Sequence, residues 1–246
     1  MFDPPLQWLD HSEDTPAANL ALDEALLDAV ANGDLPDVLR FWECPAPFVV
    51  LGTSQVLHAE ANAEACAADG VPILRRCSAG GCVLQGPGSL NYVLALRLAG
   101  RPGLHGIRRS YRALLAPLAE ALAQHGVAVA PIGISDLARD GRKVSGNAQR
   151  RARNTLLHHG TLLYRADTAA MARYLREPAE RPAYRGTRAH GAFVTALPLD
   201  AATLRATVRQ TYNAAAQPIA LPAGVAARAA ELAAGKYCDP AWTQRR

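Results

Sequence analysis

The chain has 246 residues, of which 50% are hydrophobic, and its 26 Lys and Arg outnumber its 22 Asp and Glu for a formal net charge of +4. This length allows one large domain or two small ones. No apolar run approaches the roughly 20 residues of a membrane helix or follows a basic N-terminal stretch, so we expect a globular cytoplasmic protein without a membrane segment. The basic balance favours an anionic ligand or an acidic partner. Nucleic acid is not expected, because the Arg-rich stretches at 108–112 and 150–153 are typical of a solvated face.

The first predicted element is a helix that begins after Thr15, carries Pro16 in its first turn and ends before Gly33. Two short apolar segments follow at residues 38–42 and 48–51. We expect both to be strands, separated by a Pro-Ala-Pro turn.

The middle of the chain continues this mixture of helices and strands. An alanine-rich helix is expected over residues 59–68, and a strand over 71–76 runs into a glycine-rich loop. Residues 90–96 alternate in the manner of a half-buried strand. The periodicity of residues 107–124 then predicts a second long helix.

A hairpin is predicted next, because Asp140-Gly141 is a two-residue turn signal between apolar segments. It places Lys143 at the start of a strand. Another strand is expected over residues 156–163. The helices expected after it cover residues 168–176, 201–215 and 224–234.

The Pro- and Arg-rich stretch from Glu177 to Arg188 can be either a mobile loop or ordered packing over the sheet. Elsewhere the strands come in runs joined by turns, and helices flank them. The pattern therefore predicts an α+β fold with mixed, largely antiparallel sheets, rather than a regularly alternating βαβ fold.

Lysine is rare in this chain, since Lys143 and Lys236 are the only lysines among 26 Lys and Arg. Lys143 stands among the small, turn-forming residues of the segment from Gly141 to Gln149. A compact ammonium can reach one phosphate or carboxylate oxygen in a narrow site, where the planar guanidinium of arginine is too wide. The alternative is an ordinary exposed turn residue.

The glycine-rich loop joins Arg75 and Arg76 to a run of small residues that ends at Gly88. Its glycines would let backbone amides approach an anionic group, and Arg76 could add a bidentate contact. A tight turn with surface arginines is the alternative, because the loop matches neither the Walker lysine pattern nor the dinucleotide fingerprint. The five cysteines are an odd number without metal-ligand spacing, so we expect reduced thiols and no metal site. Cys77 and Cys82, within the loop, are expected to be small packing residues.

Five segments, in their order along the chain, resemble the lipoate–protein ligase family. They are Asn19 to Glu24, Val49 to Gly52, Arg75 to Gly81, Gly141 to Gln149 and His158 to Leu163, and the match extends over roughly residues 17–165. The resemblance implies the catalytic fold shared with biotin protein ligases and octanoyltransferases, related to class II aminoacyl-tRNA synthetases. It also implies that ATP, with Mg²⁺, activates lipoate as lipoyl-AMP, and that the acyl group passes to a lysine of a lipoyl domain or of a glycine-cleavage H protein.

The resemblance also implies the site residues. Lys143 would be catalytic and touch the activated carbonyl and the α-phosphate, because a fixed ammonium stabilises charge that develops on oxygens. The residues expected to bind nucleotide and lipoyl group are Arg76, Gly80, Gly81, Cys82, Val83, Leu84 and Lys143. Those expected to bind substrate are Arg75, Ser78, Gly146, Asn147, His159, Gly160 and Thr161. We expect His158 to be a satisfied strand histidine.

Some positions depart from the family pattern. Ala79 replaces the first of three glycines, Gln85 stands where a histidine is frequent, and Ile134 to Asp136 keep only the aspartate of an Arg-Asn-Asp stretch. The chain ends at Arg246, so we expect a single catalytic domain over residues 1–246 without the accessory C-terminal domain of typical ligases. Either a separate polypeptide supplies that part, or the protein performs only the transfer step. The resemblance implies a monomer.

Two alternatives to an ATP-dependent ligase stay open. One is an octanoyl or lipoyl transferase that takes its acyl group from acyl carrier protein, through a thioester on cysteine and without ATP. No cysteine occurs in the segment before Gly141, and none follows His159 until Cys238, which argues against it. The other is a non-catalytic lipoate-binding protein, against which the retention of Lys143 argues. The sequence does not distinguish lipoate from octanoate or biotin.

Overall fold

The helices and strands come from a computed structural model that describes residues 2–179 and 181–246. Within these residues the strands are β1 (Gln7–Asp10), β2 (Val38–Trp42), β3 (Phe48–Leu51), β4 (Ile73–Arg75), β5 (Val83–Gln85), β6 (Ser89–Arg97), β7 (Ala130–Ile132), β8 (Asp136–Arg139), β9 (Arg142–Ala152) and β10 (Thr155–Leu163). The helices are α1 (Pro16–Asn32), α2 (Leu57–Glu60), α3 (Ala63–Ala68), α4 (Ile107–Ala123), α5 (Thr168–Tyr174), α6 (His190–Phe193), α7 (Ala201–Thr211), α8 (Ala223–Leu232) and α9 (Pro240–Gln244). Short 3₁₀ or π turns are η1 (Pro102–Leu104), η2 (Ala183–Arg185) and η3 (Ala233–Tyr237).

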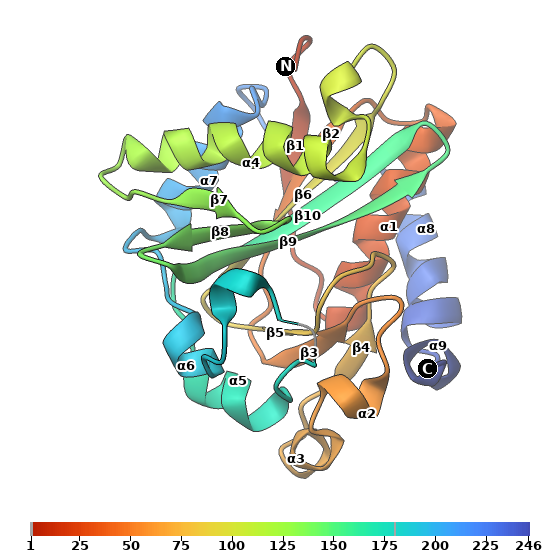
Figure 1. Cartoon of the computed structure of the whole chain (residues 1–246). Coiled ribbons are helices and arrows are strands. Elements are labelled where there is room, and N and C mark those ends of the chain that lie inside the picture. The colour runs from red at the N-terminus through yellow and green to blue at the C-terminus, as the bar shows by residue number, and fades with distance from the viewer. Residues whose placement is uncertain (1, 180) are drawn as a thin grey trace.

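Two β-sheets form the frame of the described chain (Figure 1). The large sheet has the strand order β1-β2-β6-β10-β9-β8-β7, and the small one has the order β4-β3-β5. Neighbouring strands of the large sheet are antiparallel except β1 and β2. In the small sheet β3 pairs in parallel with β4 and antiparallel with β5. This mixed, largely antiparallel arrangement flanked by helices confirms the predicted α+β class.

The large sheet separates two hydrophobic cores. Side chains of β6 alternate between them, because Tyr92 and Leu94 pack with α4 and α7 on one face whereas Val93 and Ala95 pack with α1 on the other. Figure 1 shows α4 and α7 on one side of this sheet and the small sheet, with α5 and α6, on the other. The space between the two sheets, closed on one side by α1, is where the site lies.

The first helix forms as predicted. The side chain of Thr15 accepts a hydrogen bond from the amide of Ala18 at 3.2 Å, and Gly33 ends α1 in the left-handed region with φ of 91°. Nearly the whole length of α1 is buried, since the large sheet lies on one side of it and α8 packs along another. The helix is therefore a rigid wall for the site.

The helix predicted over residues 59–68 is wrong as a single element. The chain forms α2 and α3 instead, and the break falls at Ala61, whose backbone pairs with Leu175 in an isolated bridge. Asn62 starts the second helix by accepting a hydrogen bond from the amide of Ala65 at 3.3 Å. Alanine favours a helix throughout this stretch, so only the tertiary contact decides the break. The short strands β1, β5 and β7 were not predicted either.

The segment from Glu177 to Arg188 is ordered packing wherever the structure describes it, that is, everywhere but residue 180. Arg185 is buried and donates to the carboxylate of Glu177 at 2.6 Å. Arg188 donates to the carbonyl of Gly141 at 3.0 Å, which ties the segment to the β8–β9 hairpin. No helix of the described chain is long and apolar enough to cross a membrane.

Candidate functional site

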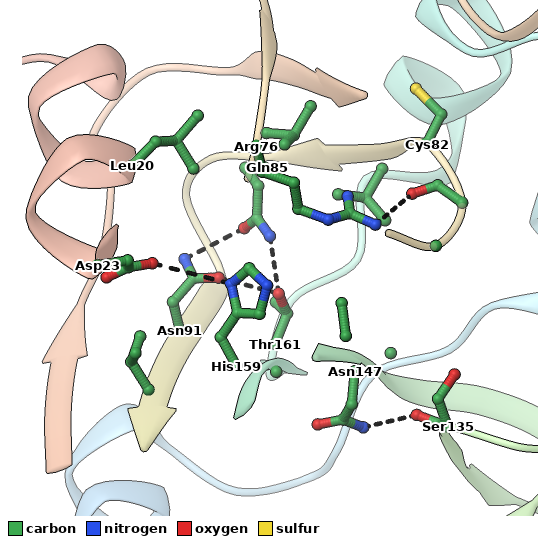
Figure 2. A pocket seen from close by; sticks show the side chains of 18 of the residues that line it. Leu20, Asp23, Arg76, Cys82, Gln85, Asn91, Ser135, Asn147, His159 and Thr161 are labelled. Carbon is green, nitrogen blue, oxygen red and sulfur yellow. Dashed lines mark hydrogen bonds and ion pairs between the residues drawn. The ribbon is translucent and has the colours of Figure 1, made fainter. Parts of the chain in front are cut away.

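A cavity of about 710 Å³, including its open mouth, lies between α1, the central strands of the large sheet and the loop that follows β4 (Figure 2). The structure brings most of the predicted site residues together here. Those that line this cavity are Arg76, Gly80, Gly81, Cys82, Val83, Lys143, Gly146, Asn147, His159, Gly160 and Thr161. Leu84 lines an adjoining cavity, whereas Ser78 and Arg75 line neither of the two.

Lys143 lies at the start of β9, beside the tight turn that the sequence predicts. Its Nζ is 2.8 Å from Oδ1 of Asp136, which starts β8. The other oxygen of Asp136 accepts a hydrogen bond from the hydroxyl of Tyr184 at 2.8 Å. Burial, and then the Asp136 carboxylate, raise the pKa of Tyr184, so its hydroxyl keeps the proton that it donates. The ammonium is therefore held from one side, and its side chain remains 25% exposed toward the cavity.

Gly146 gives the lysine side chain a flat surface to lie on. A Cβ built at this position would be 2.8 Å from both Cε and Nζ of Lys143, closer than carbon and nitrogen atoms pack. The absence of a side chain at Gly146 thus sets where the ammonium can be.

Asn147 on β9 lies opposite Gly160 on the neighbouring strand β10. Its Oδ1 accepts a hydrogen bond from the hydroxyl of Tyr92 at 2.6 Å, and its Nδ2 donates to the carbonyl of Ser135 at 2.8 Å. A Cβ at Gly160 would be only 1.8 Å from Oδ1 of Asn147. Glycine is therefore required at 160 for Asn147 to hold the Ser135 wall of the cavity.

Arg76 organises the glycine-rich loop from within. It is 7% exposed, and one terminal nitrogen donates to the carbonyls of Ala79 and Gly81 at 3.0 Å each. Its Nε donates to Oγ of Ser78 at 3.0 Å. Gly80 has φ of 107°, in the left-handed region that favours glycine. The alanine that replaces a glycine of the family pattern is the neighbouring Ala79, whose φ is not positive. Arg76 thereby shapes the loop that lines the cavity.

His159 links this loop to α1. Its Nε2 is 2.6 Å from Oγ of Ser78, and its Nδ1 is 3.8 Å from Oδ2 of Asp23. Figure 2 shows the imidazole between the loop side and the helix side of the cavity. The neighbouring His158 points the other way and is buried, where burial lowers its pKa to about 3. As predicted, His158 is a satisfied strand histidine, because the side chain of Gln149 and the hydroxyl of Tyr92 bond it at 3.1 and 3.3 Å.

Three uncharged side chains form a closed hydrogen-bond ring in the floor (Figure 2). Gln85 donates to Oγ1 of Thr161 at 2.7 Å, Thr161 donates to Asn91 at 2.9 Å, and Asn91 donates to Gln85 at 3.2 Å. Because all three satisfy one another, the glutamine that replaces the frequent histidine of the family is a fixed part of the wall.

A second cavity of about 600 Å³ opens off the first. The two share the residues Cys82, Val83, Gln85, Lys143, Gly146 and Thr161. Beyond these, the second cavity is lined mainly by apolar side chains, Leu84, Leu163, Met171, Leu175, Phe193 and Val194, with Arg185 and His190. Lys143 therefore lies at the junction of two compartments.

The structure places Arg75 away from both compartments, so the expectation that it binds substrate does not hold. Arg75 is fully buried, and it donates to the carbonyls of Gly52 at 2.8 Å and of Gln55 and Thr243 at 2.7 Å. Consecutive residues of an extended strand point to opposite sides, so Arg76 turns to the cavity and Arg75 to the C-terminal segment. Arg75 ties that segment to the strand before the loop.

The thiols near the site are protonated packing groups. Burial raises the pKa of Cys82 to about 12, although Arg76 opposes the shift. Burial likewise raises the pKa of Cys77. A thiolate is the nucleophilic form of cysteine, so neither residue is poised for attack.

Sequence reasoning missed several residues of this site. The partnership of Asp136 with Lys143 had only a weak signal, since Asp136 was noted as the retained residue of a family motif. Tyr184 lies in a stretch without periodicity, and nothing local marks it. Trp42 ends a predicted strand and Asp23 lies in the family-like segment from Asn19 to Glu24, but neither was named as a site residue. Only the meeting of α1 with the sheet brings them to the cavity.

Solved structures with this arrangement of sheets and helices define the fold class of the protein. The bi-partite lipoate protein ligase of Thermoplasma acidophilum, solved in work on an archaeal lipoylation system and its E2 lipoyl domain, matches with a TM-score of 0.84 at 20% identity over 98% of this chain and 96% of that one. A lipoate-protein ligase A bound with ATP gives a TM-score of 0.80 at 19% identity over 99% of both chains. The chain thus has the catalytic fold of lipoate protein ligases.

The sequence itself assigns the family. Residues 15–217 match the lipoyl protein ligase A/B catalytic domain, and the chain belongs to this family. It is 31% identical over 171 residues to the "Probable lipoate-protein ligase A" of Mycoplasma genitalium, covering 70% of this chain and 49% of that protein. It is 30% identical over 189 residues to the octanoyltransferase LipM of Symbiobacterium thermophilum, covering 68% of each. The chain spans about half the length of the Mycoplasma relative, and its relatives carry the names of a ligase and of a transferase.

Proposed function

We propose that this chain is a lipoate–protein ligase, which uses ATP to convert lipoate to lipoyl-AMP and passes the acyl group to a lysine of a lipoyl domain or an H protein. The observation that carries the proposal is the position of Lys143. Its ammonium lies where two cavities of different character meet. An acyl-adenylate likewise has its mixed anhydride between an acyl chain and a nucleotide. A single cation there serves both the carbonyl and the α-phosphate.

The first cavity suits the acyl chain. Its inner end, toward α1, is lined by Leu20, Trp42, Val50 and Val93, which offer an apolar surface to a hydrocarbon tail. The second cavity suits the nucleotide. Its mainly apolar lining offers a surface to a flat base, and Arg185, whose guanidinium lies 4.8 Å from the ring centroid of Phe193, adds a cation.

The chemistry needs no protein nucleophile. In the first step a carboxylate oxygen attacks the α-phosphorus and pyrophosphate leaves; in the second the acceptor amine attacks the acyl carbonyl and AMP leaves. Negative charge develops on phosphoryl and carbonyl oxygens in turn, and the fixed ammonium of Lys143 stabilises both. The backbone amide of Cys82, which lines both cavities, makes no hydrogen bond to other described groups, so it is available to a phosphate oxygen.

Asp136 is the residue that fits Mg²⁺. Within residues 2–179 and 181–246, no group of three or more His, Cys, Asp or Glu is placed to hold a metal ion. Mg²⁺ bound with nucleotide takes most of its ligands from phosphates and water and needs only one or two carboxylates. Asp136 lines the first cavity beside Lys143 and could supply one. The ion would neutralise phosphate charge while Lys143 keeps the reacting oxygens in place.

Relatives support the substrates and the acceptor. Structures with this fold have been solved with ATP, and, in protein Ta0514 of T. acidophilum, with lipoic acid. The bi-partite ligase of that organism was studied with its E2 lipoyl domain, which supports both a lipoyl-domain acceptor and an accessory part on a separate chain.

A second candidate is octanoyl transfer from a carrier protein without ATP, because the LipM relative is 30% identical. That route requires a cysteine thiolate. Cys82, which lines both cavities, has its pKa raised to about 12, which disfavours it as the nucleophile at neutral pH. The ligase is therefore the better supported of the two.

ATP–pyrophosphate exchange with lipoate, octanoate and biotin in turn tests the proposal. Lys143→Ala should lower exchange about 100- to 1000-fold, as removal of one oxyanion-stabilising donor does. Lys143→Arg should also lose most of it, because a planar guanidinium does not fit over Gly146 beside Asp136. Lys236→Arg is the matched control, because Lys236 is the other lysine of the chain, lies outside both cavities and pairs with Glu24, a carboxylate to which an arginine can also donate.

Each result has a defined meaning. Exchange that survives Lys143→Arg contradicts the role of Lys143. If no acid supports exchange, transfer from supplied lipoyl-AMP to a lipoyl domain indicates that a partner chain performs adenylation. Transfer from octanoyl carrier protein, in the absence of ATP, would instead establish the transferase.

A further inference from the structure

One carboxylate oxygen in the first cavity, the acyl cavity of the proposed function, makes no hydrogen bond within the described residues. Asp23 is 2% exposed, and its Oδ1 is 2.5 Å from a terminal nitrogen of Arg40. Its Oδ2 is buried and accepts no hydrogen bond from any described group. Buried oxygens are nearly always paired, and an unpaired one that lines a cavity indicates a group that the cavity receives. Asp23 lines the acyl cavity.

The orientation of this carboxylate is set by Arg40. Arg40 is fully buried and donates to the backbone carbonyls of His11 and Asn19 at 3.0 and 2.9 Å, and to Oδ1 of Asn19 at 2.6 Å. The guanidinium therefore cannot move to reach the second oxygen of Asp23. Oδ2 is held as a fixed acceptor on the α1 wall.

The imidazole of His159, opposite Asp23, does not form a hydrogen bond with Oδ2 either. Nδ1 of His159 is 3.8 Å from Oδ2, beyond hydrogen-bond distance, and the other ring nitrogen already meets Ser78 at 2.6 Å. A small polar group bound here could reach both walls.

A buried donor belongs to the same cavity. Nε1 of Trp42, another lining residue, also makes no hydrogen bond within the described chain. The indole nitrogen can only donate, and the Asp23 oxygen can only accept. Two complementary polar atoms thus make no hydrogen bond within the described chain, in a cavity that Leu20, Val50 and Val93 also line.

These atoms belong to the end of the cavity away from the reaction centre. Figure 2 shows Leu20 and Asp23 beside α1 at one end, and Asn147 and Ser135 at the other. Lys143 belongs to the latter end, because its ammonium lies on Gly146 and pairs with Asp136, the sequence neighbours of Asn147 and Ser135. An acid whose carboxylate meets Lys143 therefore directs its distal end toward Asp23.

We propose that Asp23 and Trp42 together form a polar subsite that selects acids whose distal end donates a hydrogen bond to Asp23 and accepts one from Trp42. Among acids of similar length, the dithiol form of lipoate offers S–H donors, the cyclic disulfide form offers only acceptors, and octanoate offers neither. The protein should therefore bind the dithiol form most tightly. This inference rests on the proposed function for the direction of the acyl chain.

Binding of the three acids to the whole protein, measured by calorimetry without ATP, tests the subsite. The Kd of the dithiol, kept reduced under anaerobic conditions, should be about 3- to 10-fold lower than that of the disulfide and of octanoate, as one additional hydrogen bond gives. Asp23→Asn should abolish or reverse this ratio. Arg40 needs an oxygen, so the amide would turn its oxygen to Arg40 and its NH₂ to the cavity, replacing an acceptor with a donor.

Asp28→Asn is the matched control. Asp28 lies on the same helix, and its carboxylate pairs with Arg228 at 3.1 Å outside the cavity, so the ratio should stay at the wild-type value. Should Asp23→Asn fail to fold, Trp42→Phe removes the donor and keeps an aromatic ring, and it should lower the preference for the dithiol over octanoate.

Equal affinities for the three acids in the wild type, as expected if water satisfies Asp23, overturn the subsite. An unchanged ratio in Asp23→Asn does so as well, and if none of the acids binds at millimolar concentration the subsite is also overturned. Pyrophosphate exchange reports separately on the ligase. Normal pyrophosphate exchange together with equal affinities would contradict only the proposed subsite. A clear preference for the dithiol without pyrophosphate exchange would contradict only the proposed ligase function.

Discussion

Gly146→Ala should disable the site by displacing Lys143 rather than by removing it. The new Cβ would be 2.8 Å from both Cε and Nζ of Lys143, and contacts of this kind need roughly 3.5 Å or more. The end of the side chain must therefore move by about 1 Å, which breaks its 2.8 Å contact with Asp136.

The size of the effect follows from this displacement. A catalytic group misplaced by about 1 Å can lower the rate by up to about 100-fold. We expect kcat/KM to fall about 10- to 100-fold, or about 1.4 to 2.7 kcal/mol of transition-state stabilisation. The free energy of unfolding should change by less than about 1 kcal/mol, because a partly exposed ion pair contributes little to stability.

Steady-state lipoylation of an acceptor domain and urea unfolding measure the two quantities. Gly224→Ala is the control, because a Cβ there meets no atom within 4 Å and the position lies on α8, far along the chain from the site. In a Lys143→Ala background, Gly146→Ala should lower kcat/KM almost no further, since the side chain that it displaces is absent. Full additivity of the two losses would refute the reasoning, as would wild-type kcat/KM for Gly146→Ala alone.

Three further outcomes are expected. Gly160→Ala should lower the free energy of unfolding by roughly 3 kcal/mol, because its Cβ would be 1.8 Å from Oδ1 of Asn147, and a thermal unfolding midpoint equal to the wild type would contradict this. Burial lowers the pKa of His158 to about 3, below the unfolded value near 6.5, so the unfolded chain binds the proton first. Stability should be lost as pH falls below 6.5, by about 2 kcal/mol at pH 5, in urea titrations of the wild type compared with His158→Gln, which should lack this part of the pH dependence. At pH 8 iodoacetamide should modify the exposed Cys238 and spare Cys82, whose pKa of about 12 keeps it a thiol, and peptide mass spectrometry that finds Cys82 alkylated first would overturn this assignment.

The predicted site was most accurate where a local signal existed. Lys143 follows a two-residue turn that the sequence marks, and the structure places it at the start of β9 as expected. Arg76 was predicted together with its neighbour Arg75, and only one of them lines the cavity. Two adjacent arginines look alike in a sequence, because which one faces the cavity depends on how β4 packs against β3 and the C-terminal segment.

The partners of the site residues could not be predicted in the same way. Tyr184 lies 48 residues from Asp136 along the chain, and Ser78 lies 81 residues from His159. Such pairs form when distant segments pack, and no periodicity in either segment indicates the other. The break between α2 and α3 has the same origin, since Ala61 leaves the helix to pair with a residue more than a hundred positions later.

The sequence by itself determined most of the element types, the tight turn before Lys143, the glycine-rich loop and the ordered motifs of the family, because these depend on neighbours within a few residues. The tertiary structure alone decided that Lys143 lies at the junction of two cavities, that Arg75 faces away from them, and that Asp23 offers an unpaired oxygen to one of them. These features depend on how two sheets and α1 close around a common space, and that closure is a property of the packed chain rather than of any one segment.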